Sequence, residues 1–153
     1  MTTLTRIYRF SASHRLHSAE LSTDQNAALY GKCNNPYGHG HDYVLEVTAA
    51  GDLDANTGLL LPVAQLDSLV EEHVLRVFAS RNINRDVPQF ATLVPTTENI
   101  AIVITRLLEA HWSAYLHTWR AHLRRVHIQE TDRNGFEIAL PRPQPTESVT
   151  THA

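Results

Sequence analysis

Residues 39–48 read His-Gly-His-Asp-Tyr-Val-Leu-Glu-Val-Thr, and the expected sheet is built around them. Successive side chains of a β-strand point to opposite faces, so alternate positions share a face. The positions expected on the inner face are His39, His41, Tyr43, Leu45 and Val47. The positions expected on the outer face include Asp42, Glu46 and Thr48. This alternation predicts a half-buried strand with two histidines at one end of its inner face.

A second strand is predicted upstream, from Leu4 to Ser13. Its inner face is expected to carry Tyr8, Phe10 and Ala12. His14 follows this strand in the same phase, so its side chain is expected on the inner face too. The segment from His17 to Asn35 is polar and irregular and predicts a long loop. Long loops inside compact domains are often functional.

Two helices are predicted after the turn region Gly51–Gly58. The first starts with Pro62 at its first position, where proline is tolerated because that amide has no helical partner. Its apolar positions follow helical spacing and are Val63, Leu66, Leu69, Val70, Val74 and Val77. A connector over residues 79–90 leads to the second helix, which starts near Thr96 with Glu98 in its first turn. Its apolar stripe is Ile100, Val103, Ile104, Leu107 and Leu108.

The last two predicted strands are Leu123–Glu130 and Phe136–Leu140, with an Asn-Gly turn at 134–135 between them. The order strand, strand, helix, helix, strand, strand predicts an α+β fold, in which two helices cover one face of a four-stranded antiparallel sheet. Residues 1–140 are expected to form a single domain. The tail 141–153 is rich in Pro, Thr and Ser and is predicted to be disordered. The open edges of such a sheet favour oligomerisation.

The composition narrows the classes of function. The chain has 153 residues and a formal charge of −3 without a basic stripe, so a nucleic-acid partner is not expected. Its apolar runs stay short of the ~20 residues that span a bilayer, and its N-terminus lacks the layout of a secretory signal, so no membrane partner is expected. The single cysteine, Cys33, excludes an internal disulfide framework. A cytoplasmic location is therefore expected.

His14, His39 and His41 are the candidate ligands of a divalent metal ion. Residues two apart on a strand point the same way, so the imidazoles of His39 and His41 can reach one ion. Three neutral imidazoles leave a fourth position open, as in a catalytic zinc site. An isolated His-x-His pair is equally compatible with ordinary surface or core histidines, and the imidazoles do not by themselves distinguish zinc from other metals.

Two further residues have open interpretations. Cys33 lies in a Gly/Asn/Pro-rich segment just before His39, where it is either an inert thiol or an acid–base group activated by nearby charge. Glu130 shares a predicted strand face with Val126 and Ile128. It is either a solvated strand end or an anchor for a ligand that carries two adjacent N–H groups, because an unpaired carboxylate on an inner face is unfavourable.

Several ordered motifs resemble the 6-pyruvoyl-tetrahydropterin synthase family. They are Phe-Ser-Ala-Ser-His (10–14), Gly-Lys-Cys-Asn-Asn-Pro-Tyr-Gly-His-Gly-His (31–41), Asp-Val-Pro (86–88), Thr-Thr-Glu-Asn (96–99) and Glu-Thr-Asp (130–132). The resemblance extends from about Arg6 to Leu140. The Cys-x5-His-Gly-His spacing is similar to that of the tetrahydropterin-forming branch, whereas 6-carboxytetrahydropterin synthases typically have a shorter spacing.

The resemblance implies the tunnelling fold, in which the sheets of a homotrimer close into a barrel that is commonly stacked into a hexamer, with active sites between subunits. It implies zinc on His14, His39 and His41, a pterin ring held by Glu130, and Cys33 as the proton-moving thiolate. The substrate would be 7,8-dihydroneopterin triphosphate, from which triphosphate is eliminated while the side chain is rearranged. The additional residues implied to bind the substrate are Thr96, Thr97 and Glu98.

One departure affects the expected chemistry. The family usually has an Asp-His proton relay after the first helix, and the aligned positions here are Ala79 and Ser80. Neither is an adequate base, because alanine does not titrate and serine needs an assisting group. His73 is the first replacement base to consider. The alternatives are therefore a zinc-dependent lyase of altered activity, a non-catalytic zinc- and pterin-binding protein, and, less well supported, a metal-storage protein.

Overall fold

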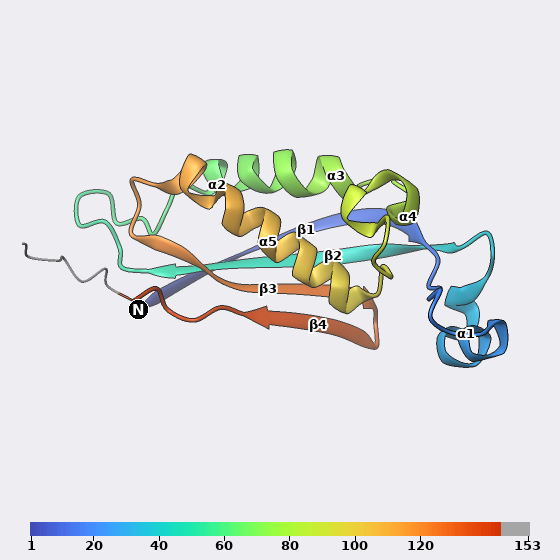
Figure 1. The fold of residues 1–153 in the computed structure, drawn as a ribbon. Coiled ribbons are helices and arrows are strands. Elements are labelled where there is room, and N and C mark those ends of the chain that lie inside the picture. The colour runs from blue at the N-terminus through green and yellow to red at the C-terminus, as the bar shows by residue number, and fades with distance from the viewer. Residues whose placement is uncertain (145–153) are drawn as a thin grey trace, which may run out of the picture.

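The computed structural model describes residues 1–144, and its centre is a four-stranded antiparallel sheet in the order β1-β2-β3-β4 (Figure 1). The strands are β1 (Thr2–His14), β2 (His39–Gly51), β3 (Ala121–Thr131) and β4 (Asn134–Ala139). Because β1 and β4 are the outer strands of this sheet, each has one edge that no other strand of the sheet pairs. The predicted sheet is confirmed.

β1 and β2 pair without interruption along their whole length. The register runs from Thr2 opposite Gly51 to His14 opposite His39. Residues that face each other directly across two strands lie on the same face of the sheet. The continuous register therefore brings the histidine that ends β1 next to the two histidines that begin β2.

β3 departs from strict alternation at two places. The register against β2 shifts between Thr48 and Ala49, so that Leu123 and Val126 are both buried although they are three residues apart. Such a bulge adds one residue to a strand and re-aims the side chains that follow it. A second shift, against β4, lies between Gln129 and Thr131 and contains Glu130.

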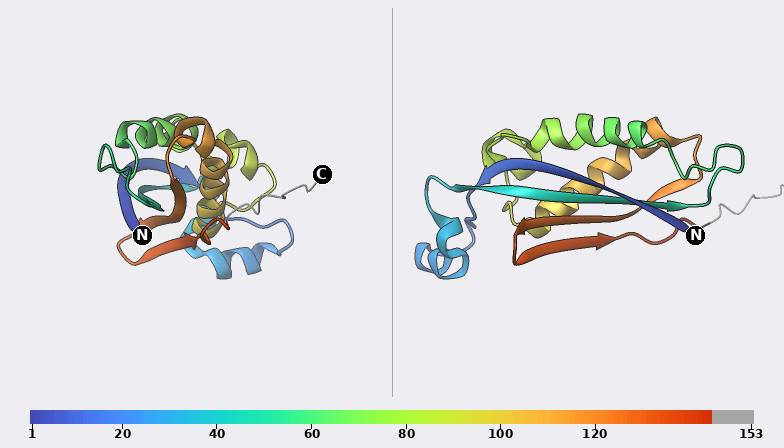
Figure 2. Two further views of the ribbon diagram at one scale, coloured as in Figure 1. Left: turned by 90° about the vertical axis from the view of Figure 1, so that its left-hand side faces the viewer. Right: turned by 180° about the vertical axis from the view of Figure 1, so that it is seen from behind.

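The helical layer covers one face of the sheet, as predicted (Figures 1 and 2). The first predicted helix begins at Val63, with Pro62 as its N-cap residue, and runs as α2 (Val63–Val70), a π-helical turn (Glu71–Leu75) and α3 (Arg76–Phe78). The second, α5 (Thr97–Leu116), is capped by the Thr96 side chain, which accepts a hydrogen bond from the Asn99 amide. The largest fully buried core side chains include Tyr43, Phe78, Leu45, Leu66, Leu69, Ile100, Ile104 and Ile128.

The prediction of an irregular loop over residues 17–35 is wrong, because this segment contains α1 (Thr23–Tyr30) and a 3-10 turn (Gly31–Asn34). Ser22 and Gln25 form a reciprocal capping box at its start. The helix has no apolar stripe and buries only Asn26, so periodicity carries no signal there. The capping pair was the signal that could have predicted it.

The buried Asn26 amide holds this α1 segment together through backbone groups of the preceding turn. It donates to the carbonyls of Ser18, Leu21 and Ser22 and accepts from the Ser18 amide. The connector at 79–90 is also partly helical, with α4 (Ile83–Asp86) and a 3-10 turn (Pro88–Phe90). These short elements lie at the sheet end where β1 finishes (Figure 1).

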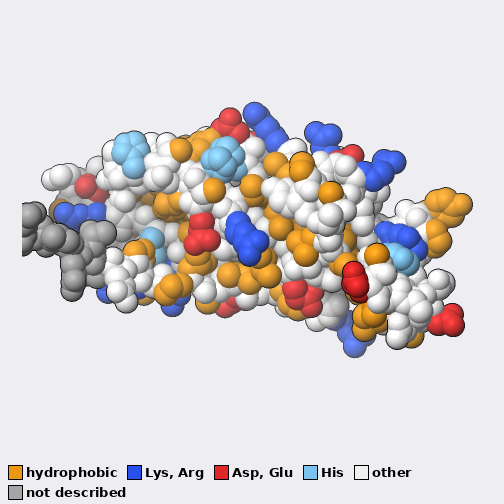
Figure 3. Space-filling model, viewed as in Figure 1, with side chains coloured by type: hydrophobic (Ala, Val, Ile, Leu, Met, Phe, Trp, Pro, Cys, Tyr) orange, Lys and Arg blue, Asp and Glu red, His pale blue; other side chains and the backbone are white. Residues whose placement is uncertain are grey.

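Residues 141–144 have no regular secondary structure, and most of the predicted disordered tail lies outside the described residues. Within residues 1–144, no helix combines the length and apolar character needed to cross a bilayer. On the face seen in Figure 3, acidic and basic side chains are interspersed between hydrophobic ones.

Candidate metal and ligand site

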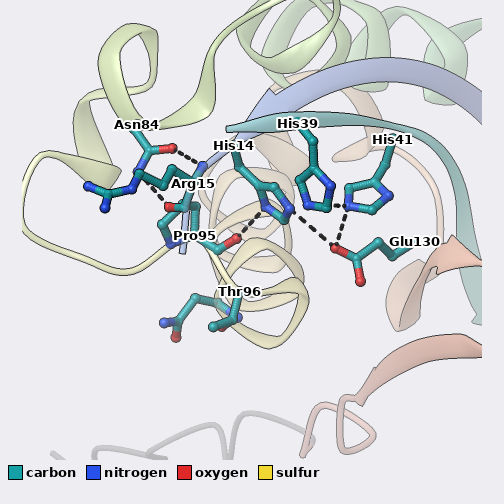
Figure 4. Close-up of polar contacts among 9 residues, drawn as sticks. His14, Arg15, His39, His41, Asn84, Pro95, Thr96 and Glu130 are labelled. Carbon is teal, nitrogen blue, oxygen red and sulfur yellow. Dashed lines mark hydrogen bonds and ion pairs between the residues drawn. The ribbon is translucent and has the colours of Figure 1, made fainter. Parts of the chain in front are cut away.

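Three imidazoles meet at the end of the sheet where β1 stops and β2 starts. The ring centroid of His14 lies 5.3 Å from that of His39 and 5.0 Å from that of His41, and the centroids of His39 and His41 are 4.5 Å apart. The Nε2 atoms of His39 and His41 are separated by 3.2 Å. Figure 4 shows the three rings pointing toward one another and toward Glu130.

The protonation of His14 follows from its backbone partner. Its Nδ1 lies 2.9 Å from the carbonyl oxygen of Pro95, and because a carbonyl can only accept, Nδ1 carries the proton. The Nε2 atom of neutral His14 therefore presents a lone pair. This atom is fully buried and has no hydrogen-bond partner among the described residues. A buried imidazole oriented in this way by a carbonyl is typical of a metal ligand.

The surroundings of His14 and His39 favour their neutral imidazoles. Burial lowers the pKa of His14 below its ordinary value, and the carbonyl of Pro95 and the charge of Glu130 oppose that effect only in part. Burial and the neighbouring His41 also lower the pKa of His39. A neutral imidazole is the form that binds a metal ion. The residues present therefore fit a divalent cation.

Cys33 is the fourth member of this group. Its Sγ and one ring nitrogen from each of the three histidines lie within 4.8 Å of one another. Burial, with a contribution from the charge of Glu130, raises the pKa of the Cys33 thiol, so that in the metal-free protein this side chain is a neutral thiol at pH 7. We call His14, His39, His41 and Cys33 the histidine–cysteine site.

Glu130 borders this site from β3. Its Oε1 atom lies 3.3 Å from Nε2 of His41 and 3.5 Å from Nε2 of His14, and its side chain is only 12% exposed. A carboxylate oxygen and unprotonated ring nitrogens repel one another at such distances unless a cation or proton lies between them. The arrangement therefore favours positive charge at this point of the sheet.

The predicted substrate-binding residues line one cavity beside the histidine–cysteine site. This cavity, of about 330 Å³, is called here the ligand cavity. Its lining includes Cys33, Thr96, Thr97, Glu98, Glu130 and Phe136. The hydroxyl of Thr96 is already used as the cap of α5, so Thr97 and Glu98 are the remaining polar side chains of that segment. The fold thus brings together residues that are far apart in the sequence, while their roles stay predictions.

Ala79 and Ser80 lie elsewhere. Ser80 has a positive φ of 58°, which few residues other than glycine adopt, and its amide donates to the Ser11 carbonyl at the edge of β1. It lines a second cavity of about 450 Å³, called here the Ser80 cavity, whose lining includes Ser11, Gly40, His41, Asp42, Arg81 and Arg85. The two cavities share no lining residue. Within one chain, Ser80, one of the two positions aligned with the usual Asp-His relay, therefore does not line the same cavity as Cys33.

His73 does not replace the relay within one chain. Its ring stacks on that of His111 in α5 at a centroid separation of 3.7 Å, and its Nε2 lies 3.3 Å from the Tyr115 hydroxyl. It lines neither the ligand cavity nor the Ser80 cavity. Its position on the helical layer could not be inferred from the sequence, because the direction of the side chain depends on helix packing.

Tyr43 is a polar residue of the site region that the sequence interpretation treated only as an apolar strand position. Its side chain is 1% exposed and stacks on Phe10, and its hydroxyl has no hydrogen-bond partner among the described residues. Burial, followed by the charges of Glu130 and Cys33, raises the pKa of this phenol, which therefore remains a donor. The signal that could have identified it is its place two residues after His41 on the same strand face.

The fold and this geometry define a class of protein: an α+β domain that collects three histidines and a cysteine at one end of an antiparallel sheet. The family model for 6-pyruvoyl tetrahydropterin synthase matches residues 3–140, so the chain belongs to that family. It is 43% identical over 132 residues to 6-pyruvoyl tetrahydrobiopterin synthase of Poecilia reticulata, covering 86% of this chain and 85% of that protein. The Homo sapiens protein of the same name is 41% identical over 131 residues, covering 86% of each.

A solved structure gives the same result. The 6-pyruvoyl tetrahydropterin synthase of Caenorhabditis elegans superimposes with a TM-score of 0.80 at 37% sequence identity, covering 92% of this chain and 96% of that one. The predicted family and the predicted fold of the single chain are therefore confirmed, while the assembly into a barrel stays a prediction.

Proposed function

We propose that this protein is a zinc-dependent lyase that acts on 7,8-dihydroneopterin triphosphate or a related reduced pterin. The observation that carries the proposal is the convergence of three imidazoles and one thiol next to a carboxylate, with the thiol of Cys33 and the carboxylate of Glu130 lining the ligand cavity. Family membership and relatives named as 6-pyruvoyl tetrahydrobiopterin synthases support the reaction class.

His14, His39 and His41 would hold the zinc ion through neutral imidazoles. Zinc suits nitrogen and sulfur donors, and the Pro95 carbonyl fixes His14 in the tautomer that a metal requires. Bound zinc would supply Lewis acidity that makes the C–H next to a side-chain oxygen easier to deprotonate.

Glu130 would anchor the ring of the pterin. A carboxylate can accept two parallel hydrogen bonds from adjacent N–H groups, such as the amino and ring N–H of a pterin. Glu130 lies where the ligand cavity meets the imidazoles, so a ring held there would direct its side chain toward the histidine–cysteine site. Thr97 and Glu98 border the same cavity and would complete the ring pocket.

Cys33 would transfer protons to and from the substrate side chain. It is the one titratable group that belongs both to the histidine–cysteine site and to the wall of the ligand cavity. Because general bases act over hydrogen-bond distance, a side chain in this position is better placed than any residue of the helical layer.

The positions of the usual relay limit the expected reaction. Ala79 and Ser80 have no group that titrates near neutral pH, so proton transfer that normally depends on this pair would be lost. We therefore propose that full conversion to 6-pyruvoyl-tetrahydropterin is slow, whereas a step that needs one base, such as triphosphate elimination or side-chain cleavage, persists. A non-catalytic zinc- and pterin-binding protein is the second candidate, favoured by the same substitutions.

We propose a homotrimer or homohexamer in the cytoplasm. β1 and β4 are the outer strands of the sheet, and a strand of a neighbouring subunit could pair with the free edge of either. The Ser80 cavity lies on the β1 side of the sheet. In such an assembly Ala79 and Ser80 would face a neighbour's site. Light scattering is expected to give a trimeric or hexameric mass, and a monomer at micromolar concentration would contradict this arrangement.

Product analysis tests the proposed activity. Purified, zinc-loaded protein is incubated with 7,8-dihydroneopterin triphosphate, and released triphosphate and pterin products are separated by chromatography. We expect triphosphate release with little 6-pyruvoyl-tetrahydropterin, and Cys33→Ala should abolish it. Binding without any product would instead support the non-catalytic candidate.

A further inference from the structure

The position of Cys33 relative to the three histidines carries one further inference. The turn Gly31–Asn34 that holds this residue is tied to the segment that follows His14. The Cys33 carbonyl accepts from the Leu16 amide at 2.8 Å, and the Asn34 side chain donates to the Leu16 carbonyl at 2.7 Å. The Arg15 guanidinium donates to the Asn34 carbonyl at 3.2 Å. The thiol is therefore positioned by backbone contacts beside the last residue of β1.

These contacts bring four donor atoms to the separations of a closed metal site. In tetrahedral zinc sites, bond lengths of about 2.1 Å to nitrogen and 2.3 Å to sulfur place neighbouring donors about 3.4–3.7 Å apart. The Nε2 atoms of His39 and His41 are already 3.2 Å apart, and the Cys33 Sγ belongs to the group within 4.8 Å. Small side-chain rotations are sufficient to close this set around one ion.

Glu130 is the other candidate for the fourth position. Its Oε1 approaches the Nε2 atoms of His14 and His41, but the carboxylate does not belong to the set whose ligand atoms are all mutually close. The sulfur of Cys33 does belong to that set, and zinc accepts thiolate readily beside imidazole. The geometry therefore favours Cys33 over Glu130.

We propose that Cys33 is the fourth metal ligand of the ligand-free protein and that an incoming pterin displaces it. On metal binding, the thiol gives its proton to solvent and a sulfur–metal bond forms. When the ligand enters, this bond breaks, an oxygen of the ligand takes the position, and the thiolate is left facing the ligand cavity. No oxidant or reductant takes part in the exchange.

This exchange deepens the proposed function, on which it rests for the metal and for the pterin. It gives Cys33 two successive roles, first as a ligand that closes the site and then as a base beside the substrate. The site would thus be four-coordinate before the ligand arrives and open only to a molecule that can replace the sulfur.

X-ray absorption at the zinc edge tests the proposal directly. Zinc-loaded wild-type protein should show one sulfur neighbour at about 2.3 Å together with nitrogen neighbours. Saturating 7,8-dihydroneopterin, which has the side-chain hydroxyls but no triphosphate, should remove the sulfur neighbour. A wild-type spectrum with only nitrogen and oxygen neighbours would overturn the coordination, and sulfur that persists with the pterin bound would overturn the displacement.

Matched variants separate Cys33 from Glu130. Cys33→Ala should lose the sulfur neighbour and weaken zinc binding by at least about 10–100-fold, the range for losing a group that only supports a ligand. Glu130→Gln should keep the sulfur neighbour, and circular dichroism should show both variants folded. Loss of the sulfur signal in Glu130→Gln would count against the assignment.

The zinc–sulfur coordination is measured independently of enzyme turnover. Absence of products with the sulfur signal intact would leave the coordination standing and remove the lyase activity. Formation of products by a protein without zinc–sulfur coordination would support the lyase activity and overturn the coordination by Cys33. A protein that binds no zinc under these conditions would overturn both proposals.

Discussion

Two cavities at the same end of the sheet differ in how many of the family's usual functional residues they contain. The ligand cavity, with the adjoining histidine–cysteine site, brings together the residues that are proposed to bind the metal ion and the pterin. The Ser80 cavity lies at the end of β1 and is lined by Ser80, one of the two positions aligned with the usual proton relay, while the other position, Ala79, precedes it in the chain. Both cavities adjoin the histidine–cysteine site, since Cys33 lines the first and His41 lines the second, so the residues of one cavity can change while those of the other are kept.

This difference has a physical basis in how each region is built. His14, His39 and Glu130 lie on strands of the sheet, and loss of the buried His14 imidazole would leave the Pro95 carbonyl without its hydrogen-bond partner, which is destabilising. Ser80 is exposed on a turn, so its replacement disturbs no packing. The Ser80 side chain can therefore vary among residues that tolerate a positive φ, whereas Ala79 packs against the hydrophobic core and is more constrained.

The largest expected effect is the loss of zinc when one of its proposed ligands is removed. His39→Ala and His41→Ala should each lose most of the zinc, because two imidazoles rarely hold this ion tightly. His111→Ala is the matched control, since that ring stacks on His73 in the helical layer. Zinc is measured per chain by atomic emission after gel filtration, and unchanged zinc in both His39→Ala and His41→Ala would refute the ligand assignment.

Restoring the Asp-His relay should increase the rate of proton transfer and leave metal binding unchanged. Ala79→Asp combined with Ser80→His should raise formation of 6-pyruvoyl-tetrahydropterin by about 10²–10⁴-fold, the usual contribution of one acid–base group. Ala79→Asn with Ser80→Asn is the control, because asparagine tolerates a positive φ but supplies no base. If natural protein forms this product at a rate that the Asp-His variant does not improve, the relay is not what limits the reaction.

Glu130→Gln should have an intermediate effect, on pterin affinity. Loss of the charged acceptor should weaken binding of a reduced pterin by about 1.5–3 kcal/mol, the range for hydrogen bonds to charged groups. Glu137→Gln is the control, because Glu137 pairs with Arg125 on the opposite face of the sheet. Calorimetry that gives equal affinities for wild type and Glu130→Gln would remove the anchoring role.

The smallest expected effect is on the pH dependence of stability of the metal-free protein. The folded pKa of His14 is lowered by burial, so its contribution is present above the unfolded value of about 6.5 and is lost as the pH falls below it. One such histidine contributes a slope of at most about 1.4 kcal/mol per pH unit. Urea unfolding of chelator-treated protein should show a slope to which His39 and His122, whose pKa values are also lowered, contribute; His14→Gln should reduce it and the exposed control His17→Gln should preserve it.

An equal slope in wild type and His14→Gln would mean that the buried imidazole is not the group that titrates. It would also weaken the contrast between a well-packed binding region and a permissive turn, because that contrast assumes that burial holds His14 neutral. The measurement is made on metal-free protein, since bound zinc would itself exclude the proton.

Much of the architecture followed from local patterns. The alternation of residues 39–48, its match with the phase of His14, and the Thr96 cap correctly predicted two strands and the start of a helix. These patterns succeed because strand alternation and helix capping arise from the covalent geometry of a few neighbouring residues. The failure at Thr23–Asn34 has the same cause, since a helix that buries one asparagine has no apolar period to detect.

Local sequence patterns thus predicted the sheet, its two covering helices and the residues of the candidate site. Three features follow only from long-range contacts: the Pro95 carbonyl orients His14 across 81 residues, the Cys33 thiol lies near three imidazoles, and Ser80 lines a different cavity from Cys33. Each of these contacts joins segments that are distant in the chain. Their distances are set by register, bulges and packing of the whole domain, which no local pattern records.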